Sequence, residues 1–364
     1  MKKVKVLIVD DSAVVRKVLT EALSKSKFIE VVGSAMDAFI AVTKIQKLNP
    51  DVLTLDIEMP RMDGITFLQK LMSTRPMPVI MVSSLTDSHA DMTMKALSLG
   101  AFDFILKANL SNQKDYESFS EELIEKVIAA GSSRMRVPVK SPVMDIPFDV
   151  TRKFSADVIL PKVSTKRFTV NSDSVIAIGA STGGTEVIAE IISKLPEDVP
   201  GIVIAQHMPE KFTKSFADRI NGISSVYVKE AEDRDRVFRG TVLIAPGGKH
   251  MLLKHDSGGY YVEINDGPPV NRHKPSVDVL FRSFAQTASS HSLGIILTGM
   301  GNDGAHGLLE IKEAGISTIA QDEASCIIFG MPGEAIKLGA ADMVKNIAGI
   351  TAEIKKMASV QMHI

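Results

Sequence analysis

The first 130 residues alternate short apolar runs with segments of helical periodicity. Five of the runs are rich in β-branched residues and are typical of buried strands: Val4 to Asp10, Val31 to Ala35, Asp51 to Asp56, Pro78 to Ser83 and Asp103 to Lys107. The last helical segment, residues 116–130, places Phe119, Leu123 and Val127 on one face. Five strand–helix units in a row predict a (βα)5 domain whose parallel sheet is covered on both faces.

A second α/β pattern begins near Ser174. The apolar run Val175 to Ala180 leads directly into Ser181-Thr182-Gly183-Gly184, and residues 185–195 again have helical periodicity. The next strand-like run covers residues 201–206. This pattern predicts a second α/β domain that is doubly wound and mostly parallel.

The length of the chain agrees with two domains, because 364 residues are more than one hydrophobic core usually serves. Basic side chains and several prolines gather between Arg134 and Arg167. We interpret this stretch as a solvated linker rather than a binding patch. The expected division is a first domain at 1–130, a linker at 131–172 and a second domain at 173–364.

Composition excludes several classes of protein. A net charge of −1 gives no overall attraction to nucleic acid. The longest apolar runs are too short to cross a bilayer, and the apolar run at the N-terminus reaches Asp10 too soon for a signal peptide. The single cysteine, Cys326, allows no internal disulfide. We therefore expect a cytoplasmic monomer that neither binds nucleic acid nor inserts into a membrane.

Charged residues end three of the strands in the first domain. Asp10 and Asp11 follow the first strand, Asp56 ends the third, and Lys107 ends the fifth. Carboxylates gathered at one rim of a sheet repel each other unless a cation lies among them, and oxygen ligands favour Mg²⁺. A simpler interpretation of any one such residue is a turn or helix cap, as we expect for Asp63.

Four motifs of the first domain resemble the response-regulator receiver family, which has a flavodoxin-like fold: LIVDDS, LDIEMPRMDG, MVSSLT and ILKA. The resemblance covers roughly residues 1–130. It implies that Asp56 accepts a phosphoryl group. It also implies supporting roles, in which the carboxylates of Asp10 and Asp11 and the carbonyl of Glu58 help to hold Mg²⁺, Ser83 and Lys107 contact the phosphoryl group, and Phe104 is the switch aromatic.

One position departs from the receiver pattern. The family usually has proline after its lysine, whereas this chain has Ala108 after Lys107. A cis bond without proline costs about 2.5–4 kcal/mol. The departure bears on the geometry of the Lys107–Ala108 bond and not on phosphorylation itself.

In the second domain, Ser181 stands at a predicted strand-to-helix turn. A hydroxyl at such a turn points away from the sheet, close to the unpaired N–H groups of the helix start, so it can act as a nucleophile. The glycines around it also loosely resemble a dinucleotide-binding loop. A dinucleotide site would need an acidic residue after the second strand to bind the ribose hydroxyl. The residue at that position is His207. We therefore favour a hydrolase.

A serine hydrolase needs a base and a carboxylate that orients it. His207 is the first candidate for the base, because its predicted strand follows the one that delivers Ser181. His250, His273 and His306 compete with it, and spacing does not decide among them.

For the carboxylate, Asp303 follows the strand-like run 293–298 in a glycine-rich loop. Asp266 and Asp322 are alternatives. Cys326 is a rival nucleophile, but the apolar run beside it indicates a buried structural thiol.

Motifs spread over residues 174–340 resemble the CheB methylesterase family: GASTGG, QHMPEKFTKSFADRI, APGGKH, NDGPPVNRHKPSVDVLF, LTGMGNDGAHG and FGMPGEA. The resemblance implies that Ser181 is the nucleophile, His207 the base and Asp303 its partner. It further implies oxyanion contacts from the backbone of Met300 and from Thr182.

Together the two resemblances imply a phosphorylation-activated esterase for bacterial chemotaxis. Its substrates would be glutamyl γ-methyl esters of chemoreceptors, with receptor glutamines as possible further substrates. The phosphoryl donor would be the chemotaxis histidine kinase. Mg²⁺ would serve the receiver, and the esterase would need no cofactor. Two other classes stay open, which are a receiver joined to a catalytically silent binding module and a receiver joined to an NAD-dependent domain.

Overall fold

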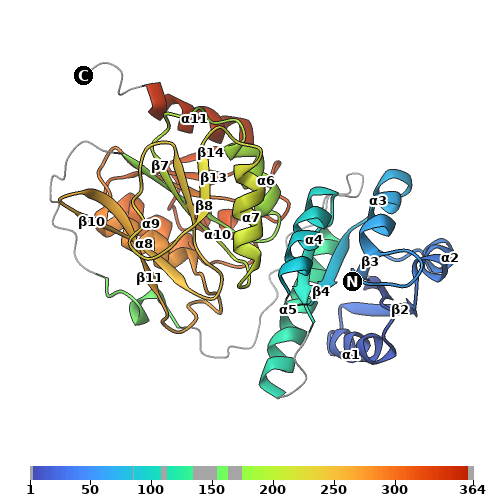
Figure 1. The fold of residues 1–364 in the computed structure, drawn as a ribbon. Coiled ribbons are helices and arrows are strands. Elements are labelled where there is room, and N and C mark those ends of the chain that lie inside the picture. Colours follow the sequence, from blue (N-terminus) through green and yellow to red (C-terminus); the bar gives the residue numbers. More distant parts are fainter. Residues whose placement is uncertain (1–2, 85, 108–112, 134–153, 163–173, 360–364) are drawn as a thin grey trace. The chain divides into compact units, whose positions relative to one another are not determined.

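The computed structural model describes residues 3–84, 86–107, 113–133, 154–162 and 174–359. The chain divides into two compact units, Met1–Val143 and Met144–Ile364, and each is described by itself. Both are α/β units, as the sequence predicts (Figure 1). Within the described ranges, no helix is long and apolar enough to span a membrane.

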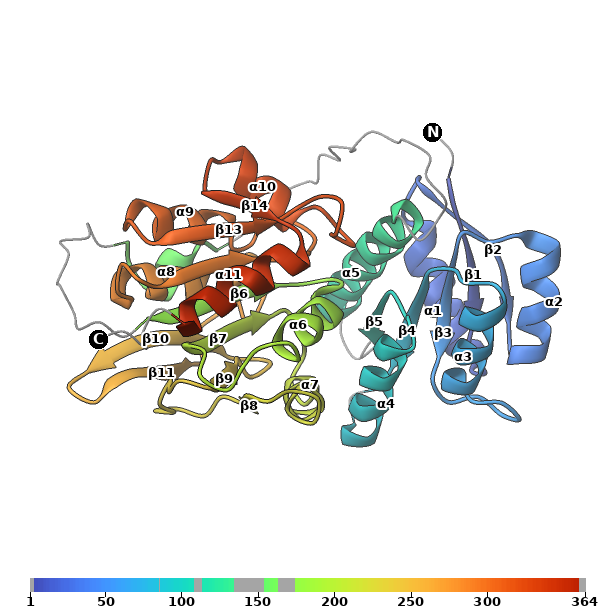
Figure 2. The same cartoon turned by 90° about the horizontal axis from the view of Figure 1, so that it is seen from above.

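The first unit is a five-stranded parallel sheet with helices on both faces. Its elements are β1 Val4–Val9, α1 Ala13–Ser24, β2 Ile29–Ala35, α2 Ala38–Leu48, β3 Val52–Asp56, α3 Gly64–Thr74, β4 Val79–Ser83, α4 Asp87–Ser98, β5 Asp103–Leu106 and α5 Gln113–Ser132. The strand order is β2-β1-β3-β4-β5. Helix α1 packs against α5, and α3 packs against α4 (Figure 2). The order reverses between β1 and β3, so the carboxyl ends of these strands flank the usual ligand crevice of such a sheet.

Short polar side chains begin several helices of this unit. Ser12, Asp37 and Asp63 are the N-caps of α1, α2 and α3, and each accepts a hydrogen bond from a backbone N–H of the first turn. Asp63 is thus the helix cap that the sequence predicts. Gly64 then lets α3 start against β3, because a Cβ atom there would lie 2.0 Å from the Asp56 carbonyl oxygen.

The second unit is built on a seven-stranded sheet. Its elements are η1 Ala156–Val158, β6 Val175–Ala180, α6 Gly184–Ile192, β7 Gly201–Gln206, α7 Phe212–Asn221, β8 Tyr227–Glu230, β9 Thr241–Ile244, β10 His250–Asp256, β11 Gly259–Asn265, α8 Val277–Thr287, β12 Leu293–Ile296, α9 Ala305–Glu313, β13 Ser317–Gln321, α10 Met331–Lys337, β14 Met343–Lys345 and α11 Ile347–Ser359. The order β14-β13-β12-β6-β7-β9-β8 is parallel throughout, and β10 and β11 form a separate antiparallel hairpin.

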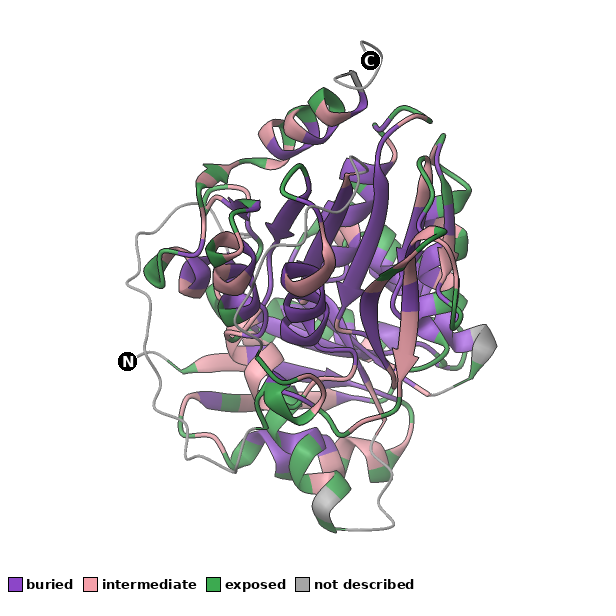
Figure 3. Cartoon of the chain, turned by 90° about the vertical axis from the view of Figure 1, so that its left-hand side faces the viewer, coloured by how far each residue is buried: buried purple, intermediate pink, exposed green. Residues whose placement is uncertain are grey.

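The core of the second unit lies between this sheet and its helices. Helix α8 packs against α9, β6 and the hairpin, and α11 packs against α6. Figure 3 shows the central strands buried along their length, and β6 and β7 have no exposed residue. Phe212, Phe216, Phe281 and Phe284 are the largest side chains that are fully buried. The buried strands hold the rim of the sheet, where the candidate site lies, in a fixed geometry.

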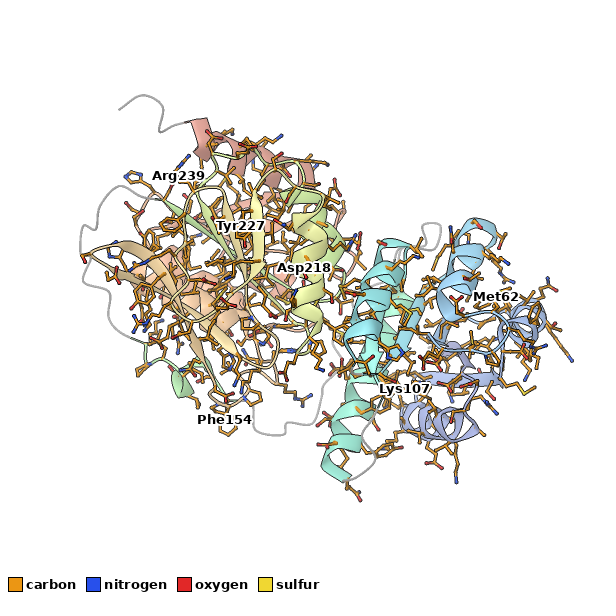
Figure 4. All side chains as sticks on the ribbon, in the orientation of Figure 1. Met62, Lys107, Phe154, Asp218, Tyr227 and Arg239 are labelled. Carbon is orange, nitrogen blue, oxygen red and sulfur yellow. The ribbon has the colours of Figure 1, made fainter. Side chains whose placement is uncertain are left out.

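Residues 154–162, inside the expected linker, pack on the second unit. Ala156 is buried against an apolar cluster. The Arg282 guanidinium contacts the Asp157 carboxylate at 2.7 Å and the Leu160 carbonyl at 3.0 Å. The Phe154 carbonyl accepts a hydrogen bond from Asn271 N–H at 3.0 Å, and Figure 4 labels Phe154 at this position. Residues 134–153 and 163–173 of the expected linker lie outside the described residues.

Candidate active site and phosphoacceptor site

Three strand ends bring the candidate catalytic residues together. Ser181 follows β6, His207 follows β7, and Asp303 lies in the loop between β12 and α9. These strands are neighbours in the order β12-β6-β7, and they are parallel, so their carboxyl ends meet at one rim of the sheet. The three residues are far apart in the sequence and are gathered by the strand order alone.

The three side chains form a hydrogen-bonded chain. Ser181 Oγ lies 3.1 Å from His207 Nδ1, and His207 Nε2 lies 2.7 Å from Asp303 Oδ2. An ionised carboxylate only accepts hydrogen bonds, so Nε2 carries the proton and donates it to Asp303. Nδ1 is then the acceptor that faces the serine hydroxyl. This is the tautomer that can take a proton from Ser181.

Asp303 is buried, and several neighbouring groups donate hydrogen bonds to its carboxylate. Besides His207, its carboxylate accepts hydrogen bonds from Asn271 Nδ2 at 2.8 Å, Ser276 Oγ at 2.9 Å and Val277 N–H at 2.7 Å. Val277 is the first residue of α8, so the carboxylate also lies at a helix N-terminus. Burial alone would raise the pKa of Asp303, but the hydrogen bond and charge of His207 hold it below its ordinary value.

A second buried carboxyl group lies beside Asp303. Asn271 Nδ2 donates to Asp278 Oδ2 at 2.7 Å as well as to Asp303, and Gly307 N–H donates to Asp278 Oδ1 at 2.7 Å. Burial, and next the negative charge of Asp303, raise the pKa of Asp278 to about 8. The surroundings thus shift the two pKa values in opposite directions, which favours the ionised form of Asp303 and the protonated form of Asp278.

The structure decides among the candidate histidines. His250 Nε2 donates to the Pro268 carbonyl at 3.0 Å, and its Nδ1 accepts from Ser276 N–H at 3.2 Å, so both of its ring nitrogens are engaged. Burial lowers the pKa of His250. His273 stacks on His207, with ring centroids 3.6 Å apart. His306 is exposed on α9. Only His207 lies between the serine and a carboxylate.

The alternative carboxylates and the cysteine have other surroundings. Asp266 forms ion pairs with Lys249 and Lys274, whose hydrogen bonds and charges lower the pKa of Asp266 to about 2. The carboxylate of Asp322 accepts from the N–H of Ser325 at 2.9 Å. Cys326 is buried and forms no disulfide, as the sequence predicts.

The expected oxyanion residues lie beside the nucleophile. A Cβ atom on Gly299 would lie 2.8 Å from Ser181 Cβ, so the backbone that leads into Met300 runs against Ser181. Thr182 is buried, and its carbonyl accepts a hydrogen bond from Thr298 Oγ1 at 3.1 Å. The backbone here is thus fixed close to the point where negative charge would develop.

The phosphoacceptor candidate lies in an acidic cluster of the first unit. Ligand oxygens of Asp10, Asp11 and Asp56 all lie within 4.8 Å of one another, as is typical of a receiver Mg²⁺ site. Lys107 Nζ lies 2.9 Å from Asp56 Oδ2 and 3.4 Å from Asp10 Oδ2 (Figure 4 labels Lys107). Strands β1, β3 and β5 thus bring together the charged strand ends that the sequence singles out.

The three carboxylates of this cluster carry more negative charge than Lys107 balances. Burial and the Asp56 carboxylate raise the pKa of Asp10 to about 6, and burial raises that of Asp56. Burial alone would lower the pKa of Lys107, but its ion pairs with both carboxylates raise it. Asp10 Oδ2 is buried, and apart from its 3.4 Å ion pair with Lys107 it has no hydrogen-bond donor among the described residues. An additional cation would satisfy this oxygen, so the residues fit a divalent metal.

The remaining receiver candidates surround the cluster at differing depths. Ser83 is buried, and its Oγ lies 3.1 Å from Thr93 Oγ1. Phe104 is buried. The Glu58 side chain is exposed and pairs with His89 at 2.9 Å, which leaves its carbonyl as the metal-ligand candidate. The Lys107–Ala108 bond lies outside the described residues.

Sequence reasoning missed the residues that support the triad. Asn271, Ser276 and Asp278 enclose Asp303, and Gln206 contacts both Ser181 and His207. Asn271 and Asp278 lie in the motif NDGPPVNRHKPSVDVLF, whose polar residues were the available signal.

Comparisons with known proteins agree with both halves of the chain. Residues 6–114 match the family model of the response regulator receiver domain, and residues 176–354 match that of the CheB methylesterase. A protein-glutamate methylesterase/protein-glutamine glutaminase of Hydrogenovibrio crunogenus is 48% identical over 97% of this chain and 98% of its own. One from Geobacter metallireducens is 50% identical over 98% and 99%.

A solved structure resembles the second unit. The CheB methylesterase catalytic domain of Thermotoga maritima is 39% identical, with a TM-score of 0.50, and the match covers 51% of this chain and 100% of that chain. This match supports the esterase fold of the second unit, and the two family models place the receiver before the esterase. The chain belongs to the CheB family of chemotaxis protein-glutamate methylesterases that carry an N-terminal receiver domain.

Proposed function

We propose that this chain hydrolyses glutamyl γ-methyl esters on chemoreceptors, with Ser181 as nucleophile, His207 as base and Asp303 as the carboxylate that orients the base. The observation that carries this proposal is the hydrogen-bonded chain from Ser181 Oγ through the His207 ring to Asp303 Oδ2. The methylesterase activity agrees with the family. The assignment of these three residues rests on their geometry.

The first half-reaction forms an acyl-enzyme. His207 Nδ1 takes the proton of the Ser181 hydroxyl while Oγ attacks the γ-carbonyl carbon of the methylated glutamate. Asp303 stabilises the imidazolium that forms. The tetrahedral oxyanion accepts hydrogen bonds from the Met300 backbone and from Thr182. When the carbon–oxygen bond to the methoxy group breaks, His207 returns the proton, and methanol leaves.

The second half-reaction restores the enzyme. Water gives a proton to His207 Nδ1 and attacks the acyl carbon, and Ser181 leaves with that proton. The products are the glutamate side chain and free enzyme. The same steps on a glutamine side chain release ammonia instead of methanol. The family name of the relatives includes this glutaminase activity.

The receiver supplies control. Asp56 accepts a phosphoryl group from the chemotaxis histidine kinase, and Lys107 and Ser83 contact the group once it is bound. Asp10, Asp11, Asp56 and the Glu58 carbonyl would hold Mg²⁺, which neutralises charge during the transfer. Phe104 serves as the switch aromatic. In the unphosphorylated chain the receiver restrains the esterase, and the phosphoryl group added at Asp56 releases it.

We place these steps in the cytoplasm. Cys326 is the single cysteine and forms no disulfide, which agrees with a reducing compartment. The kinase and the receptor segments that carry the ester would be present there.

The function is tested with methylated receptor membranes and the full-length chain, with and without a small phosphoryl donor. Ser181→Ala should release almost no methanol, while Cys326→Ala should release it at the wild-type rate. Release by Ser181→Ala near the wild-type level contradicts the proposal. Loss of methanol release in Ser181→Ala alone distinguishes an esterase from a silent binding module. Methanol release without any nicotinamide cofactor distinguishes the esterase from an NAD-dependent domain.

A further inference from the structure

Gln206, the last residue of β7, contacts the backbones of both the nucleophile and the base. Its side chain is buried, with 2% of the residue exposed. The side-chain Nε2 donates to the carbonyl oxygen of Ser181 at 3.0 Å and to that of His207 at 3.1 Å. One amide group thus joins two residues that are separated by 26 positions along the chain.

The end of the β6–β7 ladder explains why such a group is needed. His207 N–H donates to the Ala180 carbonyl at 3.1 Å, and the chain then leaves the sheet at Ser181 to enter α6. Beyond this point the two strands no longer exchange ladder bonds. A primary amide has two N–H donors, one for each of the two carbonyls. The side chain of Gln206 therefore links the two chain segments just beyond the last backbone hydrogen bond between the strands.

The orientation of this amide is determined by its surroundings. Both contacted oxygens are carbonyls, which only accept, so the nitrogen must face them. The other atom, Oε1, is buried and makes no hydrogen bond within the part of the chain that the structure describes. It lies against Gly184, where a Cβ atom would approach it to 2.4 Å. Because Gly184 has no side chain, it leaves space for the Gln206 amide.

Besides the ladder bond from His207 N–H to the Ala180 carbonyl, each of the two residues has an anchor in a different part of the fold. Ser181 N–H donates to the Thr298 carbonyl at 3.0 Å, on the β12 side. The His207 ring is held by Asp303, which rests on α8. A shift of one part relative to the other would lengthen the 3.1 Å contact between Ser181 Oγ and His207 Nδ1. The Gln206 amide restrains that relative shift directly.

We infer that Gln206 is a positioning residue, whose two hydrogen bonds hold the serine and histidine backbones at the separation that proton transfer requires. The inference rests on the proposed roles of Ser181 and His207. It does not depend on which ester is the natural substrate, because any electrophile that reacts with the activated serine reports the same geometry.

The test is the rate at which a fluorophosphonate modifies Ser181 in the full-length chain with a small phosphoryl donor present. Gln206→Met keeps the volume of the side chain and removes both donors. We expect it to slow modification by roughly 100-fold, the effect of misplacing a catalytic group by about 1 Å. With methylated receptors, kcat should fall in the same proportion while KM stays within about twofold.

The matched control is Ser292→Ala, at the opposite end of β6. Ser292 is also 2% exposed, and its Oγ accepts a hydrogen bond from Val175 N–H at 3.2 Å, at the start of the strand that delivers Ser181. Both variants lose buried hydrogen bonds and should unfold at lower temperature than wild type. Only Gln206→Met should lose reactivity at temperatures where both are folded.

Modification of folded Gln206→Met within threefold of the wild-type rate would overturn the inference, and so would an equal loss in Ser292→Ala. If Gln206→Met does not fold, Gln206→Asn takes its place, because its shorter amide reaches at most one of the carbonyls and should still cost at least tenfold. Wild-type chain that is modified at Ser181 but releases no methanol contradicts the proposed substrate alone.

Discussion

Replacing Asp303 with asparagine separates two functions of the carboxylate, which are fixing the tautomer of His207 and supplying negative charge. The new amide has one oxygen and one NH2 group to place at the two former oxygen positions. Oδ2 faces His207 Nε2 and the N–H of Val277, whereas Oδ1 faces the side chains of Asn271 and Ser276 and, at 3.3 Å, the N–H of Asp278. The energetics of these two faces decide the orientation.

The two faces differ in how readily they adapt. The N–H of Val277 belongs to the first turn of α8 and cannot turn away, so an NH2 group 2.7 Å from it would leave a buried donor unpaired at a cost of about 1–3 kcal/mol. On the other face the N–H of Asp278 is equally fixed, but its contact with Oδ1 is longer, at 3.3 Å, while the Ser276 hydroxyl rotates and the Asn271 amide can flip. We therefore expect the asparagine to keep its oxygen towards His207. The tautomer is then preserved, and only the charge is lost.

The expected rate loss follows from that orientation. An opposite charge stabilises the ionised form of a neighbouring group by about 1.4–4 kcal/mol, so losing it should slow acylation by about 10- to 1,000-fold. Had the amide turned, the tautomer would be inverted and the loss would be about 10⁴-fold.

The assay is fluorophosphonate modification of Ser181, with the folded fraction measured by circular dichroism and the low-field imidazole Nε2–H proton followed by NMR. That proton should persist in Asp303→Asn. A loss of about 10⁴-fold in folded protein would refute the orientation argument. A loss below tenfold would refute the role of the Asp303 charge.

The other predictions concern the linker segment and the receiver. A catalytic piece that starts at residue 150 should be more active than the unphosphorylated full chain. A piece that starts at residue 163 should melt at a lower temperature than the first piece and react more slowly, because it lacks the Ala156 packing and the Phe154–Asn271 hydrogen bond. Equal melting temperatures for the two pieces would contradict this. Because the pKa of Asp10 is raised to about 6 from an ordinary 3.8, the metal-free receiver should lose about 3 kcal/mol of stability as pH rises from about 4 to about 6. Mg²⁺ should bind more weakly below about pH 6. Asp10→Asn should reduce both effects in urea melts and Mg²⁺ titrations, with the remainder coming from Asp56, whose pKa is also raised. An Asp10→Asn receiver with unchanged pH dependence would argue against this assignment.

Strand ends and turns could be predicted from the sequence because short-range patterns determine them. The run Val175 to Ala180 matches β6, residues 201–206 match β7, and the five receiver strands lie within a few residues of their predicted bounds. Alternation of apolar runs with helical segments is a local signal, and so is a serine at a strand-to-helix turn. The fold class followed from these signals and is confirmed.

Choosing among the four histidines required information that no local pattern contains. His207 differs from His250 and His273 by the order of the strands, which places β7 beside β6 and β12 beside β6 on its other edge. The resemblance to known motifs pointed to His207, but the periodicity did not. Gln206 was equally hidden, because it reads as the last residue of a buried strand, and only the end of the β6–β7 ladder gives its amide a role.

The linker shows a different limit. A stretch with prolines and basic side chains is typical of a solvated connection. Residues 154–162 nevertheless pack on the second unit, because the guanidinium of Arg282, which also pairs with Glu310, binds the Asp157 carboxylate and the Leu160 carbonyl. Arg282 lies 125 residues beyond Asp157 in the sequence, so this pairing had no local signal.

We assign Ser181 as the nucleophile and propose that phosphorylation of Asp56 raises its reactivity. The most direct test is peptide mapping by mass spectrometry of the full-length chain after brief exposure to a fluorophosphonate, with and without a small phosphoryl donor. We predict a single adduct on Ser181 that forms faster with the donor in wild type, and at the slower rate in Asp56→Asn under both conditions. An adduct on another residue, or equal rates with and without donor in wild type, would contradict the account.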